Sequence, residues 1–453
     1  MPRRLSLILL LGILFVLITT SLFTSDPIRN YIPKTATGPI TAPPGSLQEP
    51  PSHSNVDTTT KVPQTKFDGA VHIALTETGG SHDEVVAAFV HSFASQPRVQ
   101  MDIYQLLPRY GIQDVMNEFD LPSKPSGPHQ PSEFLSWMKP GQKLPDIWIA
   151  TTCEIDLPTY QKNLTMLLEN GKTYIFCVTH HSDRWNTEKM ENLAAPWIEQ
   201  SRIEFVTLSP HTTDFLQKQG VGKWRTSMPP LIRYLAPVFP VSIATEKSTQ
   251  QQTNGENAPL PKDADEEELG FALQGDYDPS RRDYDSIFSR LDSFLSGGDY
   301  KKLTMHLLGH GDKKPTVPDS IKPNVQFNEQ LSYIQYYSLI ARTFALVPAF
   351  ASKEYLDRKA SSTVPAALIA GVPLVAPKEI VQAYEYLDMD VVWEQEVGRS
   401  DMDVVGDVLK MTVEERRRKK QAVRERRDEI IKGNVRRAGE WLQEAMRRMG
   451  REL

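Results

Sequence analysis

Cysteine is scarce in this chain, and an excess of basic residues is absent. Only Cys153 and Cys177 occur, so the fold cannot depend on a network of disulfides. The two could form one disulfide in an oxidising compartment, or they could remain two buried free thiols. The net charge of -6 and the pI near 6.0 argue against a general nucleic-acid-binding protein, which would be strongly basic.

Metal-binding patterns are also missing. Asp-x-Asp motifs occur at Asp388 and Asp390 and at Asp401 and Asp403, among other places, and neither of these two directly follows an expected strand. We interpret these carboxylates as charges at the ends of helices. The neighbouring pair of histidines, 180–181, lacks the spacing of metal ligands, and a simple loop is the better interpretation. We therefore expect no bound metal and no cofactor.

One long hydrophobic run stands near the start of the sequence. Residues Leu5 to Phe23 carry no charge, and a helix of this length spans the ~30 Å hydrocarbon core of a bilayer. Arg3 and Arg4 precede the run, which predicts a cytosolic tail (1–4), a signal-anchor helix (5–23) and a translocated remainder. A cleaved signal peptide is the alternative, although the run is long for one. Asn163 begins an Asn-x-Thr glycosylation pattern, consistent with a lumenal location.

Composition divides the remainder into segments. Residues 24–66 are rich in Pro, Thr, Ser and Gly and predict a disordered stem, and residues 244–268 predict a linker. Between and after them, short apolar runs alternate with amphipathic stretches, which predicts two α/β domains with parallel sheets, 67–243 and 269–412. Residues 413–453 predict a charged helix with one apolar stripe that packs across a neighbouring domain. The expected strands are 71–75, 101–106, 146–150, 173–178, 203–208, 270–273, 303–308, 325–327, 344–348 and 373–376.

The first expected strand leads into a glycine-containing turn and then a helix. Open α/β sheets bind ligands at the carboxyl ends of their strands. Gly79, Gly80 and Ser81 could allow a ligand to approach the backbone, and His82 could act as a general base. The alternative is a tight turn in which Ser81 or Asp83 caps the helix and His82 faces solvent.

The second domain begins with a similar turn. Gly275 follows a strand, and Arg281 and Arg282 open the next helix, where they could bind a diphosphate through paired hydrogen bonds. As an alternative, both arginines could pair with Asp278 and Asp285 on a solvent-exposed face.

The segment from about Gly270 to about Leu387 resembles the C-terminal half of GT-B glycosyltransferases of the family-1 and family-4 type, and most of all uncharacterised fungal members. The resemblance rests on a strand ending in Pro348, a loop, the helix after Ser362, and Gly371-Val-Pro-Leu-Val at the next strand. It implies two facing Rossmann-like domains that bind a nucleotide-sugar donor mainly in the second domain. The donor-binding residues that it implies are Arg358, Lys359, Ser361, Ser362 and Thr363, together with Gly275, Arg281 and Arg282.

The resemblance has one clear departure. Many retaining members carry a Glu-x6-Glu motif around this helix, but Ala366 and Ala367 stand in the corresponding stretch, and Glu379 follows too late. With the anchor, we expect a type II membrane glycosyltransferase of the Golgi or ER that transfers a sugar without a metal to a glycan, protein or lipid acceptor. The alternatives are a non-catalytic lumenal binding protein on the same scaffold, and an epimerase or phosphorylase of the same fold.

Overall fold

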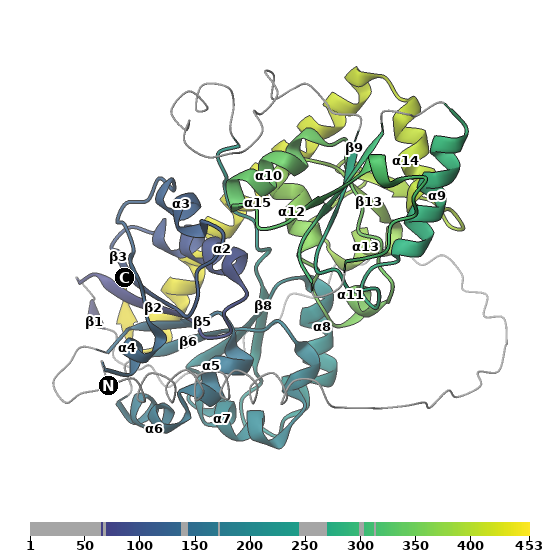
Figure 1. Ribbon diagram of the computed structural model, residues 1–453. Coiled ribbons are helices and arrows are strands. Elements are labelled where there is room, and N and C mark those ends of the chain that lie inside the picture. The colour runs from purple at the N-terminus through teal and green to yellow at the C-terminus, as the bar shows by residue number, and fades with distance from the viewer. Residues whose placement is uncertain are drawn as a thin grey trace, which may run out of the picture. The chain divides into compact units, whose positions relative to one another are not determined.

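A computed structural model of the chain describes residues 65–66, 69–136, 144–170, 173–243, 270–298, 303–311 and 314–453. Residues Val62–Leu453 form one compact unit, and the description below concerns this unit (Figure 1). The expected cytosolic tail, anchor helix and linker lie outside the described residues. Within the described residues, no helix is both long enough and apolar enough to cross a membrane.

The first domain is built on a seven-stranded sheet of parallel strands in the order β4-β3-β2-β5-β6-β7-β8. Alternate residues of each strand face opposite sides, so Phe176 packs in one apolar core and Cys177 in another. Both faces are therefore buried, as expected for a parallel sheet covered by helices. The strands are β2 (Val71–Glu77), β3 (Val99–Gln105), β4 (Ser126–His129), β5 (Ile147–Ala150), β6 (Tyr174–Val178), β7 (Ile203–Thr207) and β8 (Leu231–Tyr234). The helices are α2 (Asp83–Ala94), α3 (Ile112–Asn117), α4 (Pro131–Ser136), α5 (Cys153–Thr159), α6 (Gln161–Asn170), α7 (Glu188–Glu199) and α8 (Pro210–Gln219).

The second domain has a six-stranded parallel sheet in the order β11-β10-β9-β12-β13-β14. The predicted helix after Arg281 begins later, at Tyr284, because the Asp283 side chain accepts a hydrogen bond from the Ser286 N–H and caps it. The strands are β9 (Gly270–Gln274), β10 (Thr304–Leu308), β11 (Val325–Asn328), β12 (Ala345–Leu346), β13 (Leu374–Pro377) and β14 (Val392–Gln395). The helices are α9 (Tyr284–Ser296), α10 (Tyr333–Arg342), α11 (Glu354–Asp357), α12 (Thr363–Ala370), α13 (Lys378–Ala383) and α14 (Asp401–Lys410).

The charged C-terminal helix connects the two domains. Helix α15 (Val413–Arg448) begins at a capping box formed by Thr412 and Glu415. The Lys420 ammonium donates to the Ala341 and Thr343 carbonyls of the second domain, and the Asn434 amide donates to the Ala236 carbonyl of the first. The prediction that this helix packs across a neighbouring domain is confirmed.

Two short strands join the ends of the compact unit. Strand β15 (Arg451–Glu452) pairs in parallel with β1 (Thr65–Lys66). The expected stem therefore ends before Thr65, because backbone pairing orders the last two residues assigned to it, and such pairing needs no apolar pattern.

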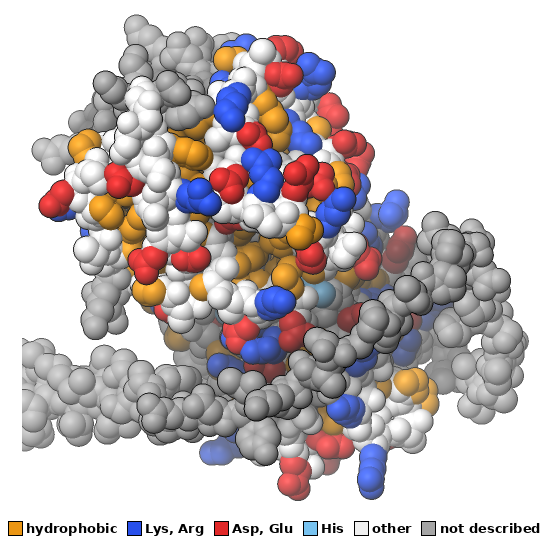
Figure 2. All heavy atoms as spheres, turned by 90° about the vertical axis from the view of Figure 1, so that its right-hand side faces the viewer, with side chains coloured by type: hydrophobic (Ala, Val, Ile, Leu, Met, Phe, Trp, Pro, Cys, Tyr) orange, Lys and Arg blue, Asp and Glu red, His pale blue; other side chains and the backbone are white. Residues whose placement is uncertain are grey.

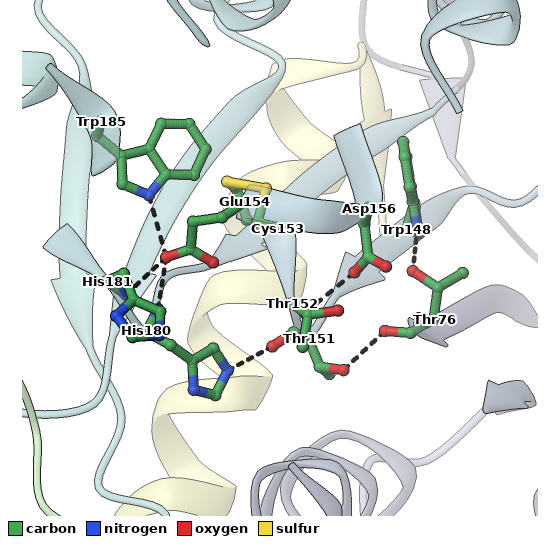
Figure 3. Close-up of a disulfide and its surroundings, with 11 residues drawn as sticks. Thr76, Trp148, Thr151, Thr152, Cys153, Glu154, Asp156, His180, His181 and Trp185 are labelled. Atoms are coloured by element: carbon green, nitrogen blue, oxygen red, sulfur yellow. Dashed lines mark hydrogen bonds between the residues drawn. A yellow bond between two sulfur atoms is a disulfide. The ribbon is translucent and has the colours of Figure 1, made fainter. Parts of the chain in front are cut away.

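The two cysteines form a disulfide between the start of α5 and the end of β6 (Figure 3). Cys153 and Cys177 are both fully buried, and β5 and β6 are adjacent strands that bring them together. Of the two possibilities that the sequence left open, the structure shows the disulfide.

Charged side chains of both signs alternate over the face drawn in Figure 2, where neither sign forms a continuous patch. This distribution agrees with the modest net charge of the sequence.

Candidate active site

A cleft of about 910 Å³ lies between the two domains. Its walls are formed where strands of both sheets end: the loops after β2, β3, β6, β7 and β8 on one side, and those after β9, β10, β11 and β12 on the other. Ligands of open α/β sheets bind at such carboxyl ends, so this cleft is the candidate active site.

Contacts between the domains border the cleft. The backbones of His181 and Lys359 pair as an antiparallel bridge, and the His211 ring lies within hydrogen-bond distance of the Lys359 and Ala383 carbonyl oxygens, at 3.1 and 3.0 Å. Elsewhere along the cleft, the Tyr333 N–H donates to the Tyr110 carbonyl at 2.8 Å.

On the first-domain wall, His82 lies at the N-cap position of α2 and lines the cleft. Its imidazole stacks on that of His180, with ring centroids 3.7 Å apart. Burial, and then the nearby His180 and His181, hold the pKa of His82 well below its usual range, so the ring is neutral at physiological pH. The alternative in which Ser81 or Asp83 caps α2 is wrong, because His82 itself takes the N-cap position.

The two glycines of this loop, Gly79 and Gly80, were expected to let a ligand approach the backbone, but they do not line the cleft. Ser81 does line it. The Ser81 N–H points to a carboxylate oxygen of the buried Glu77 at 3.4 Å, and a Cβ at Gly79 would lie 3.1 Å from the same oxygen. The turn thus closes over Glu77, and a side chain at 79 would pack tightly against that carboxylate.

A second buried carboxyl lies behind this loop. Asp156 accepts hydrogen bonds from the Thr78 hydroxyl at 2.5 Å and the Thr152 N–H at 3.0 Å. Burial raises the pKa of Asp156 to about 7, against the effect of these hydrogen bonds. The folded chain therefore holds the Asp156 proton up to about pH 7, whereas the unfolded chain releases it near pH 4.

This difference predicts the pH dependence of stability. The contribution of Asp156 to stability should fall as pH rises from about 4 to about 7, and Asp156→Asn should remove that contribution. Relative to wild type, the variant should gain up to about 4 kcal/mol between pH 4 and pH 8, measured by urea unfolding. Asp120→Asn, at an exposed position of the same domain, is the control and should follow the wild-type curve. Parallel curves for Asp156→Asn and wild type would contradict the assignment.

On the second-domain wall, Arg281 lines the cleft and is 43% exposed. Its guanidinium pairs with Asp276 at 2.5 Å and donates to the Tyr355 hydroxyl at 2.9 Å. The expected alternative partners were Asp278 and Asp285, and the carboxylate that Arg281 contacts is instead Asp276.

The neighbouring Arg282 does not line the cleft and is 3% exposed. Its guanidinium donates to the Gln274 carbonyl at 3.1 and 2.9 Å, to the Thr363 hydroxyl at 2.9 Å and to the Arg281 carbonyl at 3.3 Å. Gly275 has φ +130°, and a Cβ there would lie 2.9 Å from this guanidinium. Arg282 therefore joins the end of β9 to the start of α12, and Gly275, whose lack of a side chain leaves room for this guanidinium, lines the cleft.

The three hydroxyl residues at the start of α12 have unequal access to the cleft. Ser362 is exposed and lines it, and the Ser362 hydroxyl accepts a hydrogen bond from the Gln274 amide at 3.2 Å. Ser361 also lines the cleft but is buried, and Thr363 is buried behind it and donates to the Gln274 side chain at 2.7 Å. Ser362 is thus the hydroxyl most open to a ligand.

The two cationic side chains before α12 also differ in their access to the cleft. Lys359 lines the cleft and its ammonium pairs with Glu354 at 2.8 Å. Arg358 does not line the cleft, and its guanidinium contacts Glu354, Asp357 and, at 3.9 Å, Asp183 of the first domain. Lys359 can therefore reach a ligand, whereas Arg358 contributes to the contact between domains.

Several residues of the cleft were not predicted. Asp276 and His310 are separated by one residue from the ends of β9 and β10, so their position after a strand is the signal that could have identified them. The others carry no signal of this kind, since their side chains meet in the cleft from separate elements: Glu84, Arg109, Gln274, Tyr333, Tyr336, Glu354 and Tyr355. Among the described residues, no group of three His, Cys, Asp or Glu side chains could hold a metal ion.

The two parallel-sheet domains and the cleft between them are consistent with the GT-B architecture. No protein-family model matches the chain, and no curated protein matches it in sequence. Among solved structures, HepE of Anabaena in complex with UDP-glucose is 13% identical, over 82% of this chain and 99% of that one, with a TM-score of 0.47.

Two further solved structures are similar to the same degree. Sucrose-phosphate synthase of Thermosynechococcus elongatus is 11% identical over 83% of this chain and 98% of its own, with a TM-score of 0.49. The lipopolysaccharide outer core galactosyltransferase WaaB is 14% identical over 81% and 99%, with a TM-score of 0.45. The architecture of this chain rests on its own two sheets rather than on these similarities.

Proposed function

We propose that the chain is a glycosyltransferase that moves a sugar from a nucleotide-sugar donor to an acceptor bound against the first domain. The observation that carries this proposal is the cleft, which places Arg281, Lys359 and the start of α12 opposite His82. In this arrangement, Arg281, Lys359 and Ser362 would bind the donor diphosphate. The cationic side chains would stabilise the leaving diphosphate, so we propose transfer without a metal.

The opposite wall would bind the acceptor. The neutral imidazole of His82 has a lone pair that can accept a hydrogen bond or a proton from an acceptor hydroxyl. Its lowered pKa makes it a weak base, so contact with the acceptor hydroxyl is its first role in this proposal. Ser81, which is exposed beside it, supplies a second polar contact.

The donor side can be tested by thermal denaturation of the full chain with UDP, GDP, ADP and their sugar conjugates, with and without EDTA. A ligand at one hundred times its Kd should stabilise the protein by about 2.7 kcal/mol, and EDTA should not change the effect. Ser362→Trp should abolish the shift by filling the site, whereas Ser289→Trp, at an exposed position of α9, should keep it. If no nucleotide stabilises the wild type, the proposed donor site is wrong.

A second function has one observation in its favour. Both cations in the donor half already have carboxylate partners, Arg281 with Asp276 and Lys359 with Glu354. A non-catalytic protein that binds nucleotide sugars or glycans would also fit this arrangement. Donor binding without turnover across a broad acceptor panel would favour it, and any acceptor-dependent release of nucleotide would exclude it.

We further propose that the protein is a single-pass type II membrane protein of the Golgi or ER with its folded part in the lumen. Support comes from the apolar run 5–23 after two arginines, and from the Cys153–Cys177 disulfide, since disulfides persist in oxidising compartments. Asn163, half-buried near the start of α6, remains a predicted glycosylation site. Protease digestion of the C-terminal domain in sealed microsomes, without detergent, would contradict this orientation.

A further inference from the structure

The loop after β6 supplies two histidines to the cleft. His180 and His181 both line it, and neither belongs to a helix or a strand. The His180 ring stacks on His82, and the His181 backbone pairs with Lys359 of the second domain. The position of this loop therefore sets both the histidine pair and one of the contacts between the domains.

A single carboxylate oxygen holds the loop. Glu154 Oε1 accepts hydrogen bonds from the His180 N–H at 2.7 Å, the His181 N–H at 2.8 Å and the Trp185 indole N–H at 3.2 Å (Figure 3). Glu154 does not line the cleft, so its carboxylate contacts the loop rather than the site of a ligand.

The disulfide fixes the base of this arrangement. Cys153 directly precedes Glu154, and Cys177 lies near the end of β6, shortly before His180. The bond thus ties the backbone that carries Glu154 to the strand that leads into the loop.

The ring of His180 is oriented by a further contact. His180 Nε2 lies 2.6 Å from the Thr151 carbonyl oxygen, which can only accept, so Nε2 carries the proton. The Thr151 carbonyl thereby holds the His180 ring, while Glu154 holds the His180 backbone N–H. His82 then stacks against a ring whose position is already determined.

We infer that Glu154 is a positioning residue: together with the Cys153–Cys177 disulfide, it holds the His180–His181 loop so that His180 orients His82 in the cleft. A role of Glu154 in turnover rests on the proposed transfer reaction. The effect of Glu154 on the position of the loop is independent of that reaction. The closing experiment therefore measures the loop directly.

Hydrogen exchange and the NMR titration of His180 test this inference in the full chain. In Glu154→Leu, the His180 and His181 amides lose their acceptor and should exchange about tenfold faster or more. In Glu154→Gln, the side-chain oxygen can still accept, and protection should be retained. Glu169→Leu, at an exposed position of α6, is the control and should behave as wild type.

The NMR titration of His180 distinguishes a change in the position of the loop from a loss of the negative charge of Glu154. Burial lowers the pKa of His180, and the negative charge of Glu154 raises it. Loss of that charge alone would lower the pKa further, as expected in Glu154→Gln. Release of the loop would expose the ring, and the pKa in Glu154→Leu should rise toward its ordinary value of about 6.5.

Two results would overturn the inference: unchanged amide protection in Glu154→Leu, or the same loss of protection in Glu154→Gln. If Glu154→Leu does not fold, Glu154→Asp, which is one methylene shorter, replaces it with the same expected changes. Stabilisation by donor nucleotides should persist in Glu154→Gln, because this variant keeps the loop and its contact with Lys359, and the donor residues lie on the second domain. Absence of that stabilisation in the wild type would count against the proposed function and leave the loop measurements decisive for Glu154.

Discussion

Replacing Arg282 by alanine is expected to lower the free energy of unfolding by about 3 kcal/mol or more. The change would remove four hydrogen bonds of a buried guanidinium and leave the Gln274 carbonyl and the Thr363 hydroxyl with fewer partners. Arg282→Lys should also be destabilising, because an ammonium cannot reproduce the planar set of donors.

Urea unfolding of the full chain measures this effect. Arg290→Ala is the matched control, since Arg290 is 53% exposed on α9 and its contact to Asp403 is long, at 3.9 Å, so that its loss should cost less than about 1 kcal/mol. Equal effects of the two alanine variants would show that Arg282 has no structural role.

Replacing Arg281 by alanine is expected to have the opposite pattern: nearly unchanged stability and a 10- to 100-fold weaker affinity for the donor nucleotide. A charge-assisted hydrogen bond to a phosphate contributes roughly 1.5–3 kcal/mol, which corresponds to about this range. The exposed half of the Arg281 side chain faces the cleft, so the fold loses little when it is removed.

Replacing Asp276, the partner of Arg281, should change donor affinity in the opposite direction. Asp276 holds the guanidinium and would repel a diphosphate, so Asp276→Asn should strengthen donor binding. Isothermal titration with the nucleotide that stabilises the wild type compares both variants. Wild-type affinity in Arg281→Ala would show that the diphosphate binds elsewhere in the cleft.

Much of the architecture was predictable from hydrophobic patterns. Continuous apolar runs such as Tyr174–Val178 indicate strands buried on both faces, and every strand predicted in this way is present. The pair β1 and β15 was missed, and so were three strands of the two large sheets: β4, which is mostly exposed, β8, which is half-buried throughout, and β14, of which the second half is not buried. β4, β8 and β14 lie at sheet edges and have no continuous buried apolar run, so their sequences resemble loops.

The candidate site was predictable only at the level of its loops. The rule that ligands bind at the carboxyl ends of strands identified the turns that contain His82, Gly275 and Arg281, and all three residues line the cleft. It could not show that His82 would stack on His180, because the two loops lie far apart in the sequence.

The sequence by itself determined the two α/β domains, the crossing C-terminal helix and the loops that meet at the cleft. These features depend on the spacing of apolar residues, which is a local property of the chain. Only the tertiary structure decided that Arg281 faces the cleft while Arg282 is buried, and that Cys153 and Cys177 are bonded. Neighbouring side chains in a turn point in different directions, and which of them finds a partner depends on elements that packing brings from elsewhere in the chain.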